Sequence, residues 1–201
     1  FGYFFYTNKE QAAYKEEKVR IDSIANASRP KPDTLAQKID AAKADTLDRL
    51  ANAGDFQQAA IGTEQLLEVK NDLFTISFSN KGGQPKWVEL SKFKNMDSGH
   101  VRLAAADFDK ISYRINTGNN KSANTGDLYF KPGKLVKNTD GTQTISFALK
   151  PSDSSAAAIV HQYVIKPNDY MLDFEVQLNG GEKLLTQGVM NLTWNYTAAQ
   201  Q

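Results

Sequence analysis

The 201-residue sequence has no cysteine and two histidines, and both scarcities restrict its chemistry. Without cysteine there is no thiol nucleophile, no thiolate metal site and no disulfide scaffold. The net charge of +1, from 24 Lys and Arg against 23 Asp and Glu, gives no strong field, so we expect no nucleic-acid partner. No apolar run reaches the roughly 18 residues of a complete membrane span. The composition is typical of a globular domain and assigns no function.

The chain changes character near Gly62. Residues before it are rich in Ala and charged side chains, which favour helix, whereas residues from 65 onward are rich in Val, Ile, Thr, Phe and Tyr, which favour strand. Five of the first six residues are aromatic, and polar residues follow at once. Because aromatic rings collect at membrane–water interfaces, residues 1–6 are predicted to be the end of a transmembrane anchor.

Residues 7–64 are predicted to form a polar, largely helical linker. A charged helix is expected over 8–25, and Pro30 and Pro32 then interrupt it. A second helix is predicted over about 34–52, because Thr34 and Gln37 have the spacing of a capping box and Gly54 is placed to end the run.

Residues 65–201 are predicted to be a mainly β domain. Apolar residues alternate along the chain, and short turn signals such as Asn71-Asp72, Gly82-Gly83, Asp140-Gly141 and Gly180-Gly181 separate the runs. Consecutive strands with short reversals predict an antiparallel β-sandwich preceded by the helical linker. Further strands are expected at 101–105, 110–116, 127–137 with a break at Lys131-Pro132-Gly133, 143–150, 157–166, 170–179 and 184–196, and a polar loop at 117–125. The predicted core residues are Leu73, Ile76, Phe78, Val88, Leu90, Ile145, Phe147, Val164, Leu172, Phe174 and Val176.

The residues that could carry chemistry form no convincing site. His100 and His161 lie far apart, and a metal centre would need more ligands beside them. Asp107 and Asp109 lack the further ligands of a calcium loop, so a solvated turn is the better interpretation. Lys81-Gly82-Gly83 lacks the spacing of a phosphate loop and is interpreted as a turn. We therefore expect no catalytic, cofactor-binding or metal-ligating residue, no cofactor and no enzyme.

Two segments carry a family resemblance. Residues 67–83, LEVKNDLFTISFSNKGG, resemble the opening of the large periplasmic domain in the YidC/Oxa/Alb family of membrane protein insertases, with its Asn-Asp turn and Gly-Gly turn between strands. Residues 163–170, YVIKPNDY, are similar to that family's strand and Asn-Asp-Tyr turn, and Leu172, Phe174 and Val176 continue the next strand. The Asn-rich loops and the Ala/Lys/Asp-rich linker resemble members from the Bacteroidota.

The resemblance implies a fold, a location and partners. The fold would be a β-supersandwich similar to galactose mutarotase, with residues 65–201 as its first portion, incomplete at the C-terminus. The parent protein would sit in the bacterial inner membrane through the N-terminal anchor, with this domain facing the periplasm. Its partners would be nascent membrane proteins and components of the Sec translocon, and this domain would be an accessory part.

The mutarotase-like fold raises one alternative function. Sugar epimerases of that fold use a pair of His and a Glu to move a proton on the sugar. A carbohydrate-binding or epimerase-like domain therefore stays open as the alternative, although fold analogy alone assigns no activity.

Overall fold

The computed structural model describes residues 15, 17–20, 34–96, 98–103, 106, 108–153 and 158–196.

 For residues 34–39 and 41 of the helix that follows, only the backbone is described. The chain has two compact units, residues 1–43 and residues 44–201. Residues 15 and 17–20 are helical. The predicted anchor end at 1–6 and the side chains of the predicted capping box lie outside the described residues.

The second predicted helix is confirmed. Helix α2 spans Thr34–Ala53, followed by the 3-10 turn η1 (Gly54–Phe56) and the short helix α3 (Gln57–Ala60). Gly54 ends α2 with a φ of 48°, and a Cβ at this position would lie 1.9 Å from the Thr117 carbonyl oxygen. Glycine is needed here both for the left-handed backbone and for the close approach.

Two antiparallel sheets make up most of the second unit. The first has the order β1-β2-β3-β4, with β1 (Leu66–Lys70), β2 (Phe74–Ser79), β3 (Gln84–Lys94) and β4 (His100–Leu103). The second has the order β12-β11-β10-β8, and β9 also pairs with β10. Its strands are β8 (Lys131–Pro132), β9 (Val136–Lys137), β10 (Gln143–Leu149), β11 (Ile159–Ile165) and β12 (Leu172–Leu178).

Smaller elements join the sheets. Strand β5 (Lys110–Ser112) pairs with β13 (Thr193–Asn195), and β6 (Arg114–Gly118) pairs with β7 (Lys121–Asn124). Three short helical turns complete the described chain: η2 (Thr125–Asp127), α4 (Gly181–Leu184) and η3 (Thr186–Gly188).

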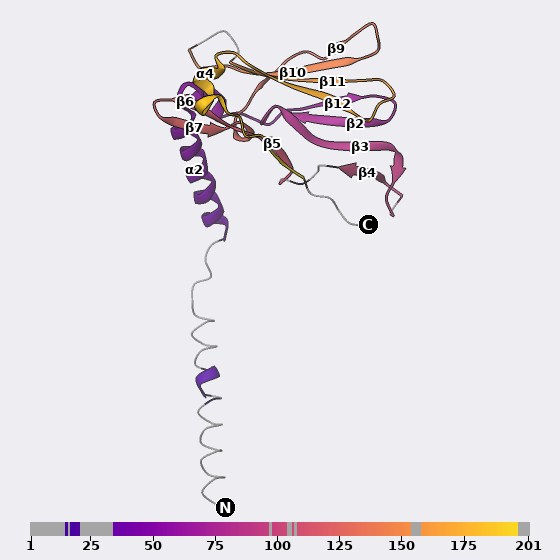
Figure 1. Ribbon diagram of the computed structural model, residues 1–201. Coiled ribbons are helices and arrows are strands. Elements are labelled where there is room, and N and C mark those ends of the chain that lie inside the picture. The colour runs from indigo at the N-terminus through magenta and orange to yellow at the C-terminus, as the bar shows by residue number, and fades with distance from the viewer. Residues whose placement is uncertain are drawn as a thin grey trace, which may run out of the picture. The chain divides into compact units, whose positions relative to one another are not determined.

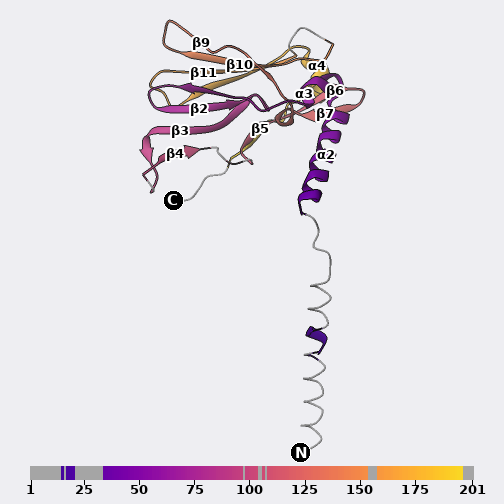
Figure 2. The ribbon, with the colours of Figure 1, turned by 180° about the vertical axis from the view of Figure 1, so that it is seen from behind.

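The two main sheets face each other and enclose the core. Figures 1 and 2 show β10, β11 and β12 as one layer over β2 and β3. Phe78 of β2 lies 4.7 Å from the Tyr163 ring of β11 and 5.9 Å from the Phe147 ring of β10, measured between ring centroids. The predicted fold class, an antiparallel β-sandwich after an N-terminal helix, is confirmed.

The predicted core is mostly confirmed, with one error. Five of the predicted residues are buried: Leu73, Ile76, Phe78, Ile145 and Phe147. Five more are partly buried and pack against the core: Val88, Leu90, Leu172, Phe174 and Val176. Val164 was assigned to the wrong face, because its neighbours Tyr163 and Ile165 are the buried residues of β11. Side chains alternate along a strand, so all three cannot point inward.

Three segments differ from their predicted structure. Within 127–137 the strands are only the two-residue β8 and β9, and β8 lies at Lys131–Pro132, where a break was predicted. Residues 117–125 form a hairpin arm and its turn instead of a plain polar loop, with Asn119 and Asn120 at positive φ between β6 and β7. Residues 184–196 contain the end of α4, η3 and β13 instead of one strand, and Gly180 caps α4 in the left-handed region instead of making a hairpin. Asn and Gly both tolerate positive φ, so local composition could not distinguish these turns.

Candidate functional site

An apolar groove runs between the edges of the two sheets. Its main cavity has a volume of about 440 Å³. The side chains come from β2, β3 and β4 on one sheet, from β11 and β12 on the other, and from β5 and β13. The apolar and aromatic lining residues are Ile76, Pro85, Val88, Leu103, Ile111, Tyr163, Tyr170, Met171, Leu172, Phe174, Leu192, Trp194 and Tyr196. A second cavity of about 390 Å³ shares four of these residues and extends the apolar surface to Phe93.

The groove exists because β12 is an edge strand. The inward residues of β11, such as Tyr163 and Ile165, are fully buried, whereas Phe174 and Val176 of β12 are half-buried. A strand at a sheet edge has a neighbour on one side only, so its inward side chains are covered less.

The rim of the groove carries large apolar side chains that face solvent. Met171 is 70% exposed and Trp194 is 71% exposed. Tyr170, Leu192 and Tyr196 are also exposed, and the Phe93 and Tyr170 rings lie 6.1 Å apart. Exposed apolar side chains gathered in this way are typical of surfaces that bind another polypeptide or a ligand.

A buried hydrogen-bond network lies behind the groove. The Gly83 carbonyl oxygen is 3.0 Å from Nδ1 of His161 and accepts a hydrogen bond of 2.9 Å from the Tyr163 hydroxyl. Nε2 of His161 is 2.8 Å from the Tyr113 hydroxyl. We call these four residues the His161 network. Tyr163 stacks on Phe174 at 4.7 Å, and both rings also line the groove.

Burial controls the ionisation of this network. It lowers the pKa of His161, an effect that the nearby carbonyls of Gly83 and Gly82 oppose. Burial also raises the pKa values of Tyr113 and Tyr163. Since desolvation disfavours every charged form, all three side chains are neutral near pH 7.

The two histidines do not share a site. His161 is 2% exposed, and both of its ring nitrogens are in hydrogen bonds, so it is not accessible to a substrate. His100 is exposed on β4, and its Nδ1 is 3.1 Å from the Leu90 carbonyl oxygen. The pair that sugar chemistry would require is therefore not assembled in one accessible place.

The other sequence candidates are turn residues where they are described. The Asp109 carboxylate accepts a hydrogen bond from the Ala106 amide, and the Asp109 amide donates to the Ala106 carbonyl. Asp109 is therefore in a turn, but the predicted solvation is wrong, because the residue is only 8% exposed. Asp107 lies outside the described residues. Gly82 and Gly83 have positive φ in the β2–β3 turn, as a turn interpretation requires. Within the described ranges there is no group of three or more His, Asp or Glu that could hold a metal ion.

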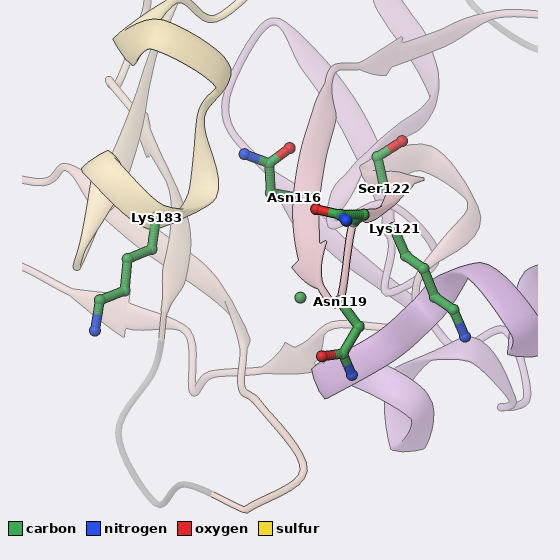
Figure 3. Close-up of a pocket in the computed structure, with 7 residues that line it drawn as sticks. Asn116, Asn119, Lys121, Ser122 and Lys183 are labelled. Atoms are coloured by element: carbon green, nitrogen blue, oxygen red, sulfur yellow. The ribbon is translucent and has the colours of Figure 1, made fainter.

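A polar pocket of about 480 Å³ lies beside the β6–β7 hairpin (Figure 3). Asn116, Asn119, Lys121 and Ser122 of the hairpin line it together with Lys183 of α4. In Figure 3 the amino groups of Lys121 and Lys183 point to opposite sides of the pocket. The two cations therefore do not converge on one anion, and the pocket has no built binding site.

Sequence reasoning found Asn71 as a turn residue but missed its long-range contacts. Its Oδ1 accepts hydrogen bonds from the Leu73 and Phe74 amides within the β1–β2 turn. Its Nδ2 donates to the carbonyls of Lys166 and Asp169 in the β11–β12 turn, at 3.0 and 2.9 Å. The two segments that carry the family resemblance thus contact each other through this side chain, in addition to the contacts of Tyr163 with Gly83 and Phe78.

Among the described helices, none has the length and apolar character needed to cross a bilayer.

Comparisons with known proteins agree with the resemblance. Residues 66–201 match a family described as YidC periplasmic domain. The chain is 29% identical over 199 residues to the membrane protein insertase YidC of Chlorobaculum tepidum. This alignment covers 96% of this chain and 32% of that protein. It is 27% identical over 204 residues to the YidC of Phocaeicola vulgatus, covering 99% of this chain and 31% of that protein. The chain thus spans about a third of the length of these relatives. No solved structure matches it significantly.

Proposed function

Because the chain belongs to the YidC periplasmic domain family, we propose that it is the periplasmic accessory part of a membrane protein insertase. The observation that carries the proposal is the family match over residues 66–201, which includes every strand of the sandwich. The parent protein helps to insert and fold inner-membrane proteins, alone or with the Sec translocon. Insertion breaks no covalent bond, so this function needs no general acid or base in the domain.

The proposed organisation follows from the chain's order. Residues 1–6 are the end of a membrane anchor, 7–64 are a linker, and 65–201 belong to the periplasmic domain. Phe56, Ala59 and Ala60 lie in the sandwich core, so the last part of the linker packs as part of the domain.

Insertion by the intact protein tests the function. We would reconstitute the intact protein in vesicles, with and without residues 66–196, and supply ribosome-bound nascent inner-membrane proteins. If the domain is accessory, removing it is expected to reduce the amount of inserted product for some nascent proteins but not to abolish insertion. A parallel series of vesicles that also contain the Sec translocon tests whether the two cooperate. Unchanged insertion of every nascent protein in both series would contradict the proposal.

We also propose that residues 65–201 are only the first portion of the domain, and that chain following residue 201 covers the apolar groove in the intact protein. The support is the exposed rim around Met171, together with relatives about three times as long as this chain. Cysteine labelling tests it, since this chain has no cysteine of its own. Met171→Cys is expected to react with maleimide quickly in the isolated chain and slowly in the intact protein.

Val136→Cys is the matched control, because Val136 is 51% exposed on β9, away from the groove. It is expected to react at the same rate in both forms. Equal rates for Met171→Cys in the two forms would show that the groove stays open.

A further inference from the structure

The His161 network joins three parts of the domain that are distant in the sequence. His161 comes from β11, Gly83 from the β2–β3 turn and Tyr113 from the connection between β5 and β6. The imidazole also packs against Phe130 and Phe174, with ring centroids 4.6 and 5.4 Å away. It is therefore a buried contact between both sheets and the connecting segments.

The hydrogen bonds specify one protonation state. A carbonyl oxygen can only accept, so Nδ1 of His161 carries the proton and donates it to Gly83. In a neutral ring Nε2 then accepts from the Tyr113 hydroxyl. The Tyr163 hydroxyl supplies the second hydrogen bond to the Gly83 oxygen. Every polar atom of the network has a partner when the ring is neutral.

A second proton on the ring would break this arrangement. Nε2 would become a donor, and the Tyr113 hydroxyl would have to turn its own hydrogen away from its partner. The His161 ring contacts Tyr113, Phe130 and Phe174. Tyr163 donates to the same Gly83 oxygen as the ring, and both tyrosines are neutral. Burial lowers the pKa of His161, and the backbone hydrogen bonds with Gly83 and Gly82 raise it. A buried cation without a counter-charge is strongly unfavourable.

We propose that the His161 network is an acid-sensitive clamp behind the apolar groove. Protonation of His161 reverses its hydrogen bond to Tyr113 and leaves a buried cation, so the ring moves toward solvent. This opening separates His161 from the Gly83 turn and loosens Tyr163 and Phe174. The release exposes more apolar surface at the groove, because these two rings line it. This inference is independent of the proposed function.

The direction of the pH dependence follows from linkage. The open form titrates near the ordinary histidine value of 6.5, and the closed form has a lower pKa. Below about pH 6.5 the open form therefore binds more protons, and the opening equilibrium grows by up to about tenfold per pH unit until the closed form also titrates. Above that pH the opening equilibrium is independent of His161.

Hydrogen exchange measured by mass spectrometry on the intact protein tests the clamp. We would compare pH 7.5, 6.5 and 5.5, corrected for intrinsic exchange rates, in peptides that contain residues 80–86 and 159–165. Faster corrected exchange in both peptides at pH 5.5 is expected. His161→Gln keeps a donor and an acceptor but cannot titrate, so it is expected to lose the pH dependence. His100→Gln is the matched control and should behave like the unsubstituted protein.

Exchange that is independent of pH in the unsubstituted protein, or a pH dependence that persists in His161→Gln, would overturn the proposal. If His161→Gln does not fold, ring ¹⁵N shifts of His161 in the unsubstituted protein decide the question. Ring protonation that coincides with faster exchange supports the clamp, and protonation without faster exchange refutes it.

Discussion

At the scale of single residues, Gly83 is a tightly constrained position in the core. Its φ is 56°, and an added Cβ would lie 2.9 Å from the Phe147 Cβ and 3.2 Å from Nδ1 of His161. Its carbonyl oxygen also accepts two buried hydrogen bonds. The sequence predicts a tight turn here, but the crowding arises from strands that are distant along the chain.

Gly83→Ala is expected to lower the free energy of unfolding by about 2–5 kcal/mol. Left-handed backbone costs a residue with a Cβ about 1–2 kcal/mol, and overpacking adds about 1–3 kcal/mol. Urea unfolding measures the change. Gly188→Ala is the control, because Gly188 has a φ of 71° and nothing lies within 4 Å of its added Cβ. Equal losses for the two variants would show that packing around Gly83 contributes nothing.

At the scale of elements, Asn71 ties two turns together. The β1–β2 turn belongs to the first sheet and the β11–β12 turn to the second, and one side-chain amide bonds to both. A short polar side chain thus fixes how the ends of the two sheets meet.

Asn71→Ala is expected to lower the free energy of unfolding by about 2–6 kcal/mol, since four hydrogen bonds are lost and each contributes about 0.5–1.5 kcal/mol. Amide exchange should increase at Leu73 and Phe74. Asp72→Ala, at the exposed neighbouring position, is the control and should change stability little. A loss in Asn71→Ala no larger than in the control would rule out the tie between the turns.

At the scale of the whole molecule, the compact unit begins before the strands do. It runs from Ala44 to Gln201. Phe56 is 2% exposed within the core, and the Tyr129 amide donates to the Ala59 carbonyl at 2.7 Å. The helical segment before Gly62 therefore covers part of the sandwich.

A fragment of residues 44–201 is expected to melt at a higher temperature than a fragment of residues 65–201. Removing Phe56 and its neighbours uncovers apolar core, and an open apolar surface favours aggregation. Calorimetry and light scattering measure both effects. Identical melting of the two fragments would show that the helical segment is dispensable for stability.

His100→Ala in the intact protein is expected to leave growth unchanged in cells depleted of their insertase. His100 is exposed and contacts a carbonyl of its own sheet, and insertion needs no proton transfer. Asp109→Asn should behave in the same way at equal protein level. A growth defect from His100→Ala in a stable, folded protein would reopen the alternative of a site on the sandwich.

Several features were predictable from sequence because local chemistry decides them. The strands around Asn71-Asp72 and Gly82-Gly83 follow from alternation and turn residues, and Gly54 correctly marks the end of α2. The hairpin at 119–120 and the short elements after Gly180 were not predictable, since Asn and Gly suit several turn types.

By itself the sequence determined the change from helix to sheet and the antiparallel sandwich, because periodicity and residue type act over a few neighbouring positions. Only the tertiary structure decided that Val164 points outward, that His161 is buried beside Gly83 and Tyr113, and that an apolar groove borders β12. Those features depend on which strands lie opposite each other, and the packing of residues far apart in the chain sets that arrangement.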